Sequence, residues 1–449
     1  MGTEARATRQ SIGALARSGA AGGVIKLASA GLTFLVFVAA AMAMDERQFG
    51  LFSTAYAGAS LVSFFAPVGQ HAAVMRFWPQ YAGNGDLSSA NGLMARALAL
   101  AAAGVAVASL AVAAGGLLPG MAEWRGLFLA AALSAFALGW SEFTSCAFRA
   151  KGALVAGLLP RDIVWRAASI AAFMAAVFLL PGIGAVVATW LMAGLLLLCV
   201  APQTAVLLRD TVSAPRGPLS PFQKREFRTV TLGLWGVTAL PPALGQASTL
   251  VVAAILGPEA AGALFVAERI MRLALLALNG INQAIAPQIS AAFHAGDRAH
   301  VQRITGLAAC AGFLLALAAL LVFIVFGKPL LSVFDPAYAT PAMHAALVIL
   351  GIGAAVGTAC GPSELLMQLT GLQQALFRLL AVVNTLGLGV TAALTFLLGP
   401  VGAALGIAGT IAVWCVTAVG IARRRIGIDP SILGFLAGQD ARILLKGRA

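Results

Sequence analysis

The sequence predicts an all-α polytopic membrane protein. Of its 449 residues, 60% are hydrophobic and only 10% are charged, and the mean hydropathy of +0.94 exceeds what one soluble core can bury. The apolar runs are continuous over about 20 residues and do not alternate with a period of two. Because backbone polar groups in hydrocarbon must be satisfied within the spanning structure, such runs indicate transmembrane helices rather than the strands of a barrel.

Polar breaks and breaks containing Pro or Gly divide these runs into about twelve predicted spans. The spans cover residues 19–43, 50–72, 93–118, 126–147, 163–181, 184–207, 230–255, 260–286, 304–327, 341–367, 376–398 and 401–422. The longest hydrophilic break is rich in Pro, Ser and basic residues, which predicts a cytoplasmic linker between two lobes of about six spans. The predicted organisation is an N-terminal cytoplasmic segment at 1–18, an N-lobe at 19–208, the linker at 209–229, a C-lobe at 230–422 and a cytoplasmic tail at 423–449.

The basic residues predict the orientation in the membrane. The formal net charge is +13, but the 29 Lys and Arg residues are scattered among short connections and form no patch interleaved with aromatic residues, so a nucleic-acid partner is not expected. One set of alternate connections holds only Arg47, Arg125 and Lys328. Nearly all the others fall on the opposite side together with both termini, which the positive-inside rule places in the cytoplasm.

The two predicted lobes resemble each other in sequence. "MDERQFGLFSTAY" (44–56) matches "LGPEAAGALFVAE" (256–268), with Gly50 aligned to Gly262, and "LLPGIGAVVATW" (179–190) matches "LLGPVGAALGIA" (397–408). These matches occur in the same order in both lobes. They predict two parallel repeats around a central polar cavity, an arrangement typical of secondary transporters.

Polar residues recur on one side of several predicted spans. Glu268, Arg272, Asn279 and Gln283 follow one another at helical spacing in the eighth span, which predicts a polar stripe. Further candidates for the cavity wall are Lys26 in the first span, Tyr56 and Ser60 in the second, and Gln246 in the seventh, where Pro241 and Pro242 predict a bend.

Charges inside the predicted spans allow two interpretations. An intramembrane Arg or Lys normally faces water or a partner and marks a pathway, so Lys26 and Arg272 are candidate substrate-binding residues. Alternatively, Glu268 and Arg272 form an ion pair along one helix while Arg269 extends toward the membrane surface. Lys26 has no acidic neighbour in its own predicted helix.

Two carboxylates lie near predicted cytoplasmic ends of spans. Glu142 and Glu364 occupy similar places in the two lobes and are candidates for proton coupling. Salt bridges to Arg149 and Arg378 are the alternative, and interfacial anchoring is favoured because a charge at a helix end costs little.

No catalytic motif is found in the sequence. The His, Cys and acidic residues show no metal-ligand spacing, and there is no Gly-rich phosphate-binding loop. The sequence therefore predicts a protein that is not an enzyme and that needs no cofactor or metal.

"FGLFS" (49–53), "ILGPEAAGALFVAERIMRL" (255–273) and "AIAPQISAAFHAGDRA" (284–299) resemble bacterial polysaccharide or O-antigen flippases of the multidrug/oligosaccharidyl-lipid/polysaccharide exporter superfamily. This resemblance extends over nearly the whole chain. It implies a two-lobed flippase for lipopolysaccharide or exopolysaccharide biosynthesis in the bacterial inner membrane. The implied substrate is an undecaprenyl-diphosphate-linked oligosaccharide, moved from the cytoplasmic to the outer leaflet by alternating access. The implied partners are membrane lipids and polysaccharide assembly proteins.

The resemblance also implies a cationic cavity that receives the diphosphate, with Lys26 and Arg272 on cavity-facing spans. This sequence departs from a strongly cationic lumen, because Glu268 offsets one charge and the second span has none. An ion-coupled multidrug exporter of the multidrug and toxin extrusion type is the main alternative. A membrane glycosyltransferase or polymerase is less well supported, because the predicted outside loops are short and offer no catalytic site.

Overall fold

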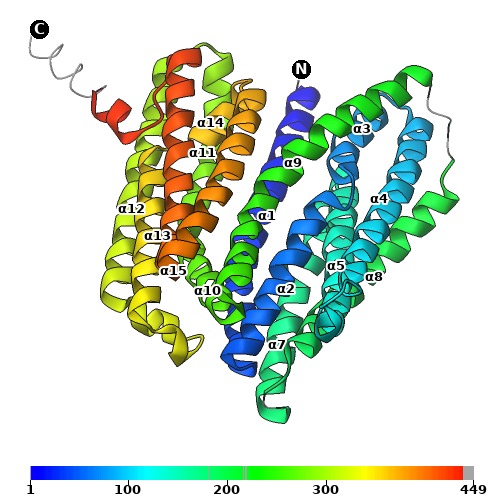
Figure 1. Cartoon of the computed structure of the whole chain (residues 1–449). Helices are drawn as coiled ribbons and strands as arrows, with labels where there is room; N and C mark the ends of the chain where they lie inside the picture. Colours follow the sequence, from blue (N-terminus) through cyan, green and yellow to red (C-terminus); the bar gives the residue numbers. More distant parts are fainter. Residues whose placement is uncertain (1, 181, 216, 218–219, 438–449) are drawn as a thin grey trace, which may run out of the picture. The chain divides into compact units, whose positions relative to one another are not determined.

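The computed structural model describes residues 2–180, 182–215, 217 and 220–437, and within these ranges every regular element is helical. The chain divides into two compact units, Met1–Leu250 and Val251–Ala449, called unit 1 and unit 2 below. The predicted all-α fold is confirmed (Figure 1). The predicted lobe boundary at 209–229 and the central cavity between lobes stay predictions.

Unit 1 contains most of the N-terminal helices. They are α1 (Gly2–Ala43), α2 (Glu46–Phe65), α3 (Gln70–Gly83), α4 (Leu87–Gly115), the 3-10 turn η1 (Ala122–Trp124), α5 (Arg125–Ala150), α6 (Leu154–Leu159), the π-helical turn η2 (Pro160–Val164), α7 (Trp165–Leu179), α8 (Ala185–Ser213) and α9 (Pro221–Leu256), whose last turn lies in unit 2. The central helix is α5, which packs against α2, α3, α4, α6 and α8. Its many Ala, Gly and Ser residues let neighbouring backbones approach closely.

Unit 2 continues with the remaining helices. They are α10 (Pro258–Ala274), α11 (Leu276–His294), α12 (Arg298–Ser332), the 3-10 turn η3 (Pro336–Tyr338), α13 (Pro341–Ala359), α14 (Ser363–Leu369) and α15 (Gln373–Ile426). Within α15, Gly399 has a positive φ of 62° and joins two helices across a kink. The two arms, orange and red in Figure 1, pack against each other at Gly406, where an added Cβ would lie 2.5 Å from the Cα of Thr391.

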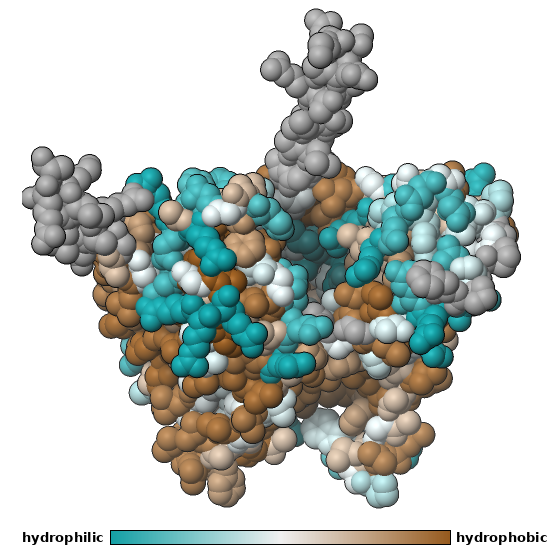
Figure 2. All heavy atoms as spheres, turned by 90° about the horizontal axis from the view of Figure 1, so that it is seen from above, coloured by the Kyte–Doolittle hydropathy of each residue, from teal (hydrophilic) through white to brown (hydrophobic). Residues whose placement is uncertain are grey.

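Long apolar helices confirm a multi-pass membrane protein. Nine helices in the described ranges are long and apolar enough to cross a membrane, and a tenth candidate is the bent pair Gln223–Leu240 and Pro242–Leu256. The bend of 42° confirms the kink predicted at the Pro241–Pro242 pair. On the face that Figure 2 displays, large areas of hydrophobic residues lie beside groups of hydrophilic ones. The exact number of about twelve spans stays a prediction.

Two details differ from the sequence-based expectation. The predicted span 260–286 is interrupted at Leu275, so Glu268 and Arg272 lie on α10 whereas Gln283 lies on α11. The prediction of a polar stripe along one continuous helix is therefore wrong. The apolar segment predicted at 163–181 begins earlier, at Leu154, which places Arg161 inside a candidate span rather than in a connection.

Candidate functional site

A π-helical turn in unit 1 carries the first group of charged residues. Pro160 lacks a backbone N–H, and the backbone N–H of Trp165 donates to the carbonyl of Pro160, five residues earlier. This wider turn carries Arg161 and Asp162 where α6 meets α7. Single π turns of this kind occur frequently at functional sites.

Asp162 is the centre of an ion cluster that joins three segments. Its side chain is only 4% exposed, and it accepts hydrogen bonds from Lys26 Nζ on α1 at 2.6 Å and from an Arg166 guanidinium nitrogen at 3.1 Å. The Nε of Arg166 also donates to the hydroxyl of Thr33 on α1, at 2.7 Å. Lys26 therefore has an acidic partner, but it is supplied by a different helix.

Glu142 on α5 forms the second ion pair of this region. Its carboxylate accepts a hydrogen bond from Arg161, whereas Arg149, the partner expected from sequence, donates to the Sγ of Cys146. His71 on α3 lies within electrostatic range of both Glu142 and Arg161. We call Lys26, Arg161, Arg166, Glu142 and Asp162 the unit 1 ion cluster. It has three basic and two acidic side chains, so its formal charge is positive.

In unit 2 the charges pair along one helix. Arg272 donates to Glu268 across one turn of α10 at 2.8 Å, as the ion-pair interpretation predicted. The guanidinium carbon of Arg269 lies 4.3 Å from the centre of the Phe265 ring, a cation–π contact rather than an extension to the surface alone.

The two units share one arrangement of cation and carboxylate. The side chain of Lys26 is 47% exposed while that of Asp162 is 4% exposed, and the side chain of Arg272 is 41% exposed while that of Glu268 is 7% exposed. In each unit the carboxylate is buried and holds a cation whose other side is accessible. Both cations can therefore offer hydrogen bonds to a ligand without leaving their partners.

The remaining candidates lie in varied environments. Tyr56 packs edge-on against Phe37 with ring centres 5.1 Å apart, and Ser60 is buried in α2. Gln246 is half-buried on α9 and Gln283 is exposed on α11. Asn279 falls in α11, and its side chain is outside the described part.

Glu364, the second coupling candidate, lies on the short helix α14. It accepts a hydrogen bond from Gln368 at 3.1 Å, and no described contact joins it to Arg378. Glu364 lines a cavity of about 360 Å³ that is formed by α10, α11, α13 and the following helices of unit 2. The described residues contain no group of three or more His, Cys, Asp or Glu that could hold a metal ion.

Comparison with solved structures identifies the fold. An inward-facing multidrug resistance MATE family transporter of the MOP superfamily superimposes with a TM-score of 0.67 at 16% identity, over 95% of this chain and 99% of that one. A MOP superfamily transporter from Pyrococcus furiosus, described as having a binding pocket of reverse polarity, gives a TM-score of 0.59 at 17% identity over 96% of both chains. A MATE transporter of Vibrio cholerae gives a TM-score of 0.52 at 19% identity, over 90% of this chain and 96% of that one. The fold is that of MOP superfamily transporters.

Residues 15–293 match the family described as polysaccharide biosynthesis protein. This match covers more than half of the chain, and the protein belongs to that family. A comparison with curated protein sequences gives no match. Family and fold together support a membrane transporter.

Proposed function

We propose that this protein is a flippase that moves an undecaprenyl-diphosphate-linked oligosaccharide from the cytoplasmic to the outer leaflet of a bacterial inner membrane. The observation that carries the proposal is the repeated pair of a half-exposed cation and a buried carboxylate, Lys26 with Asp162 and Arg272 with Glu268. Intramembrane cations of this kind mark the path of an anionic substrate. Membership of a polysaccharide biosynthesis family supports a glycan-bearing substrate.

The chemistry of these cations suits a diphosphate. An ammonium and a guanidinium form short charge-assisted hydrogen bonds to phosphate oxygens, and Arg can do so with two nitrogens at once. The buried carboxylates fix the cations in place, so that less side-chain freedom is lost when the substrate binds. The polar groups of Tyr56, Gln246 and Gln283 are suited to hydrogen bonding with sugar hydroxyls.

The proposed transport mechanism is alternating access, in which the two repeats of the fold open the substrate path to one side of the membrane at a time. The charged head group crosses along a polar path while the prenyl tail stays in lipid. Glu142 and Glu364 are the proposed coupling residues, and protonation of Glu142 requires its pair with Arg161 to weaken. Both termini are proposed to lie in the cytoplasm, where polysaccharide assembly proteins are the proposed further partners.

An ion-coupled multidrug exporter is the second candidate, because MATE transporters are among the structural neighbours. A cationic drug needs a carboxylate that is available to it. The buried carboxylates of both pairs are already neutralised by a cation, which lowers their attraction for a second one. The charge arrangement therefore favours the anionic lipid-linked substrate.

Native mass spectrometry of the purified protein tests the proposal directly. The protein is mixed with an undecaprenyl-diphosphate oligosaccharide and with lipophilic cations, as wild type and as Lys26→Ala and Arg272→Ala. We expect selective retention of the glycolipid and retention weakened by about tenfold or more in each variant, since a hydrogen bond to a charged group is worth about 1.5 to 3 kcal/mol.

Arg125→Ala is the matched control. The substitution removes one positive charge, as the other two do, but at an exposed residue at the start of α5. It should retain the glycolipid as the wild type does. Retention of the cations alone would replace the flippase proposal with the multidrug exporter. Equal loss in Arg125→Ala would show a general charge effect and remove the specific role of Lys26 and Arg272.

A further inference from the structure

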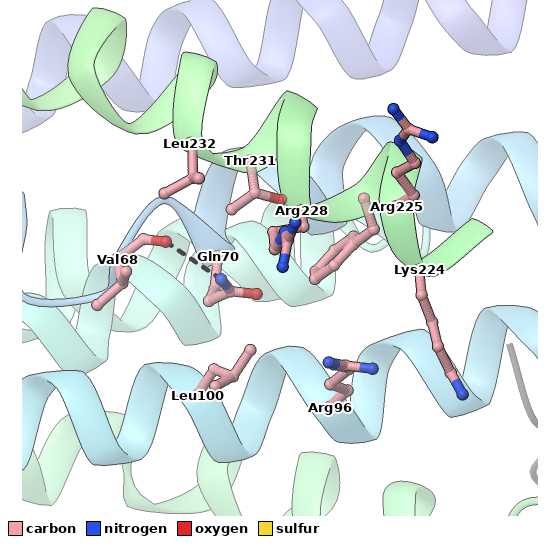
Figure 3. A pocket seen from close by; sticks show the side chains of 10 residues that line it. Val68, Gln70, Arg96, Leu100, Lys224, Arg225, Arg228, Thr231 and Leu232 are labelled. Carbon is pink, nitrogen blue, oxygen red and sulfur yellow. Dashed lines mark hydrogen bonds between the residues drawn. The ribbon is translucent and has the colours of Figure 1, made fainter. Parts of the chain in front are cut away.

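A cavity of about 560 Å³ lies in unit 1 beside the first half of α9, and no residue of the unit 1 ion cluster lines it (Figure 3). Its wall is formed by the turn before α3, by α4 and by α9. Four basic side chains line it together with apolar ones. The lining residues are Val68, Gln70, Arg96, Leu100, Lys224, Arg225, Phe227, Arg228, Thr231 and Leu232.

The four basic residues have no acidic partner in the described part of the chain. No ion pair is formed there by Arg96, Lys224, Arg225 or Arg228, and Glu226 is not among the lining residues. Arg96 from α4 and Arg228 from α9 extend from opposite walls, with Gln70 near them (Figure 3). Like charges that face one cavity repel each other, and an anion between them removes this cost.

Two buried polar atoms of the same wall also lack partners. Gln70 is 3% exposed and Thr231 is 4% exposed, and neither the Oε1 of Gln70 nor the Oγ1 of Thr231 has a hydrogen-bond partner in the described part. The Nε2 of Gln70 is occupied by the carbonyl of Val68 at 3.1 Å. Buried polar groups are rarely left without a hydrogen-bond partner. These two unpartnered atoms therefore indicate a ligand that offers an acceptor to the Thr231 hydroxyl and a donor to the Oε1 of Gln70.

The apolar part of the wall distinguishes a lipid from a free anion. Leu100 on α4 and Leu232 on α9 are 43% and 56% exposed beside the cations. Free phosphate gains nothing from such side chains, whereas an acyl chain attached to the phosphate covers them. Basic pockets between transmembrane helices are a known form of anionic lipid recognition.

We propose that this pocket binds an anionic phospholipid of the phosphatidylglycerol type. The phosphate lies between Arg96 and Arg228 and accepts from the Thr231 hydroxyl, while a glycerol hydroxyl of the head group donates to the Oε1 of Gln70. Lys224 adds positive charge at the end of the pocket. A bound lipid then links α9 to α3 and α4 at the start of the bent segment of unit 1.

The test uses the full-length protein in native mass spectrometry with phosphatidylglycerol, phosphatidylcholine, inorganic phosphate and undecaprenyl diphosphate as separate probes. The wild type is compared with Arg96→Gln/Arg228→Gln, and with Arg424→Gln/Arg425→Gln as a control. Arg424 and Arg425 are exposed on α15 in unit 2, so the control removes the same charge elsewhere. We expect the wild type to bind phosphatidylglycerol more tightly than phosphatidylcholine. Arg96→Gln/Arg228→Gln, but not the control, should weaken phosphatidylglycerol binding about 25-fold, since each basic residue near a lipid surface contributes about fivefold.

Thr231→Val is a second variant, which keeps the charge and the shape of the pocket. It should weaken phosphatidylglycerol binding by about tenfold or more, since a hydrogen bond to a charged group is worth about 1.5 to 3 kcal/mol. Equal binding of the two phospholipids, or equal loss in both charge variants, would overturn the proposal. Displacement of phosphatidylglycerol by millimolar inorganic phosphate would assign the pocket to a free anion. Pocket-dependent binding of undecaprenyl diphosphate alone would make it a substrate entrance. Since neither Lys26 nor Arg272 is changed here, phosphatidylglycerol binding in this pocket can be present or absent whether or not the proposed flippase function holds.

Discussion

The charged residues of the two units are held by different means. In unit 1, Asp162 holds both Arg166 of α7, four residues later, and Lys26 of α1, which lies 136 residues earlier in the sequence. In unit 2, Glu268 and Arg272 pair within one turn of α10. The contact between Lys26 and Asp162 exists only when α1 packs against the π-helical turn, whereas the Glu268–Arg272 pair, like the pair of Asp162 with Arg166 four residues later, needs only local helical structure. The same exposed cation can therefore be positioned by tertiary or by local structure.

This difference has an energetic consequence. Arg166 is mostly buried, with 15% of its side chain exposed, and it depends on Asp162 for compensation of its charge. Arg272 is 41% exposed and can be solvated without its partner. Loss of a carboxylate should therefore cost more in unit 1 than in unit 2.

The largest expected effect is that of Asp162→Asn. It leaves buried Arg166 and half-exposed Lys26 without a counter-charge, and breaking a buried ion pair in this way typically costs about 3 to 5 kcal/mol. A marked fall in Tm, measured by thermal unfolding in detergent, is the expected result. The matched control is Asp210→Asn, because Asp210 pairs with Lys151 at 2.8 Å but is 49% exposed. A comparable fall in both variants would contradict the special role of the unit 1 ion cluster.

The features that depend on local sequence were predicted correctly. Hydropathy alone indicates the all-α fold, because composition over about 20 residues decides whether a helix can span lipid. The bend in α9 follows from adjacent prolines, and the pairing of Glu268 with Arg272 follows from their spacing of four residues.

Features that depend on packing could not be predicted in this way. No local pattern links Lys26 to Asp162, although an acidic residue two positions after Pro160 within an apolar run was an available signal. The same signal would have placed Arg161 inside the span. The break at Leu275 has neither Gly nor Pro at its position, so a continuous polar stripe was assumed.

Close helix packing in unit 2 predicts the next effect. In α15, a Cβ at Gly406 would lie 2.5 Å from the Cα of Thr391 on the other arm, so Gly406→Ala must shift a backbone. Overpacking of this kind costs about 1 to 3 kcal/mol, and a lower Tm is expected. Gly409→Ala is the control, since no atom lies within 4 Å of the Cβ added at Gly409. It should leave Tm unchanged or raise it slightly, because Ala favours a helix interior more than Gly does. Equal shifts in the two variants would show that the contact between the arms does not limit stability.

The smallest expected effect comes from Glu268→Gln. The substitution removes the local ion pair on α10 but keeps the side-chain shape. Because Arg272 is 41% exposed and can be solvated without the carboxylate, the free energy of unfolding should fall by about 1 kcal/mol or less. If this variant lowers Tm as much as Asp162→Asn, the distinction between tertiary and local positioning of the two cations is wrong. If Tm is retained but Arg272 loses affinity for the glycolipid, Glu268 serves to orient the guanidinium. The second result would extend the comparison from stability to function, because the buried carboxylate of each unit would then act on substrate through the cation that it holds.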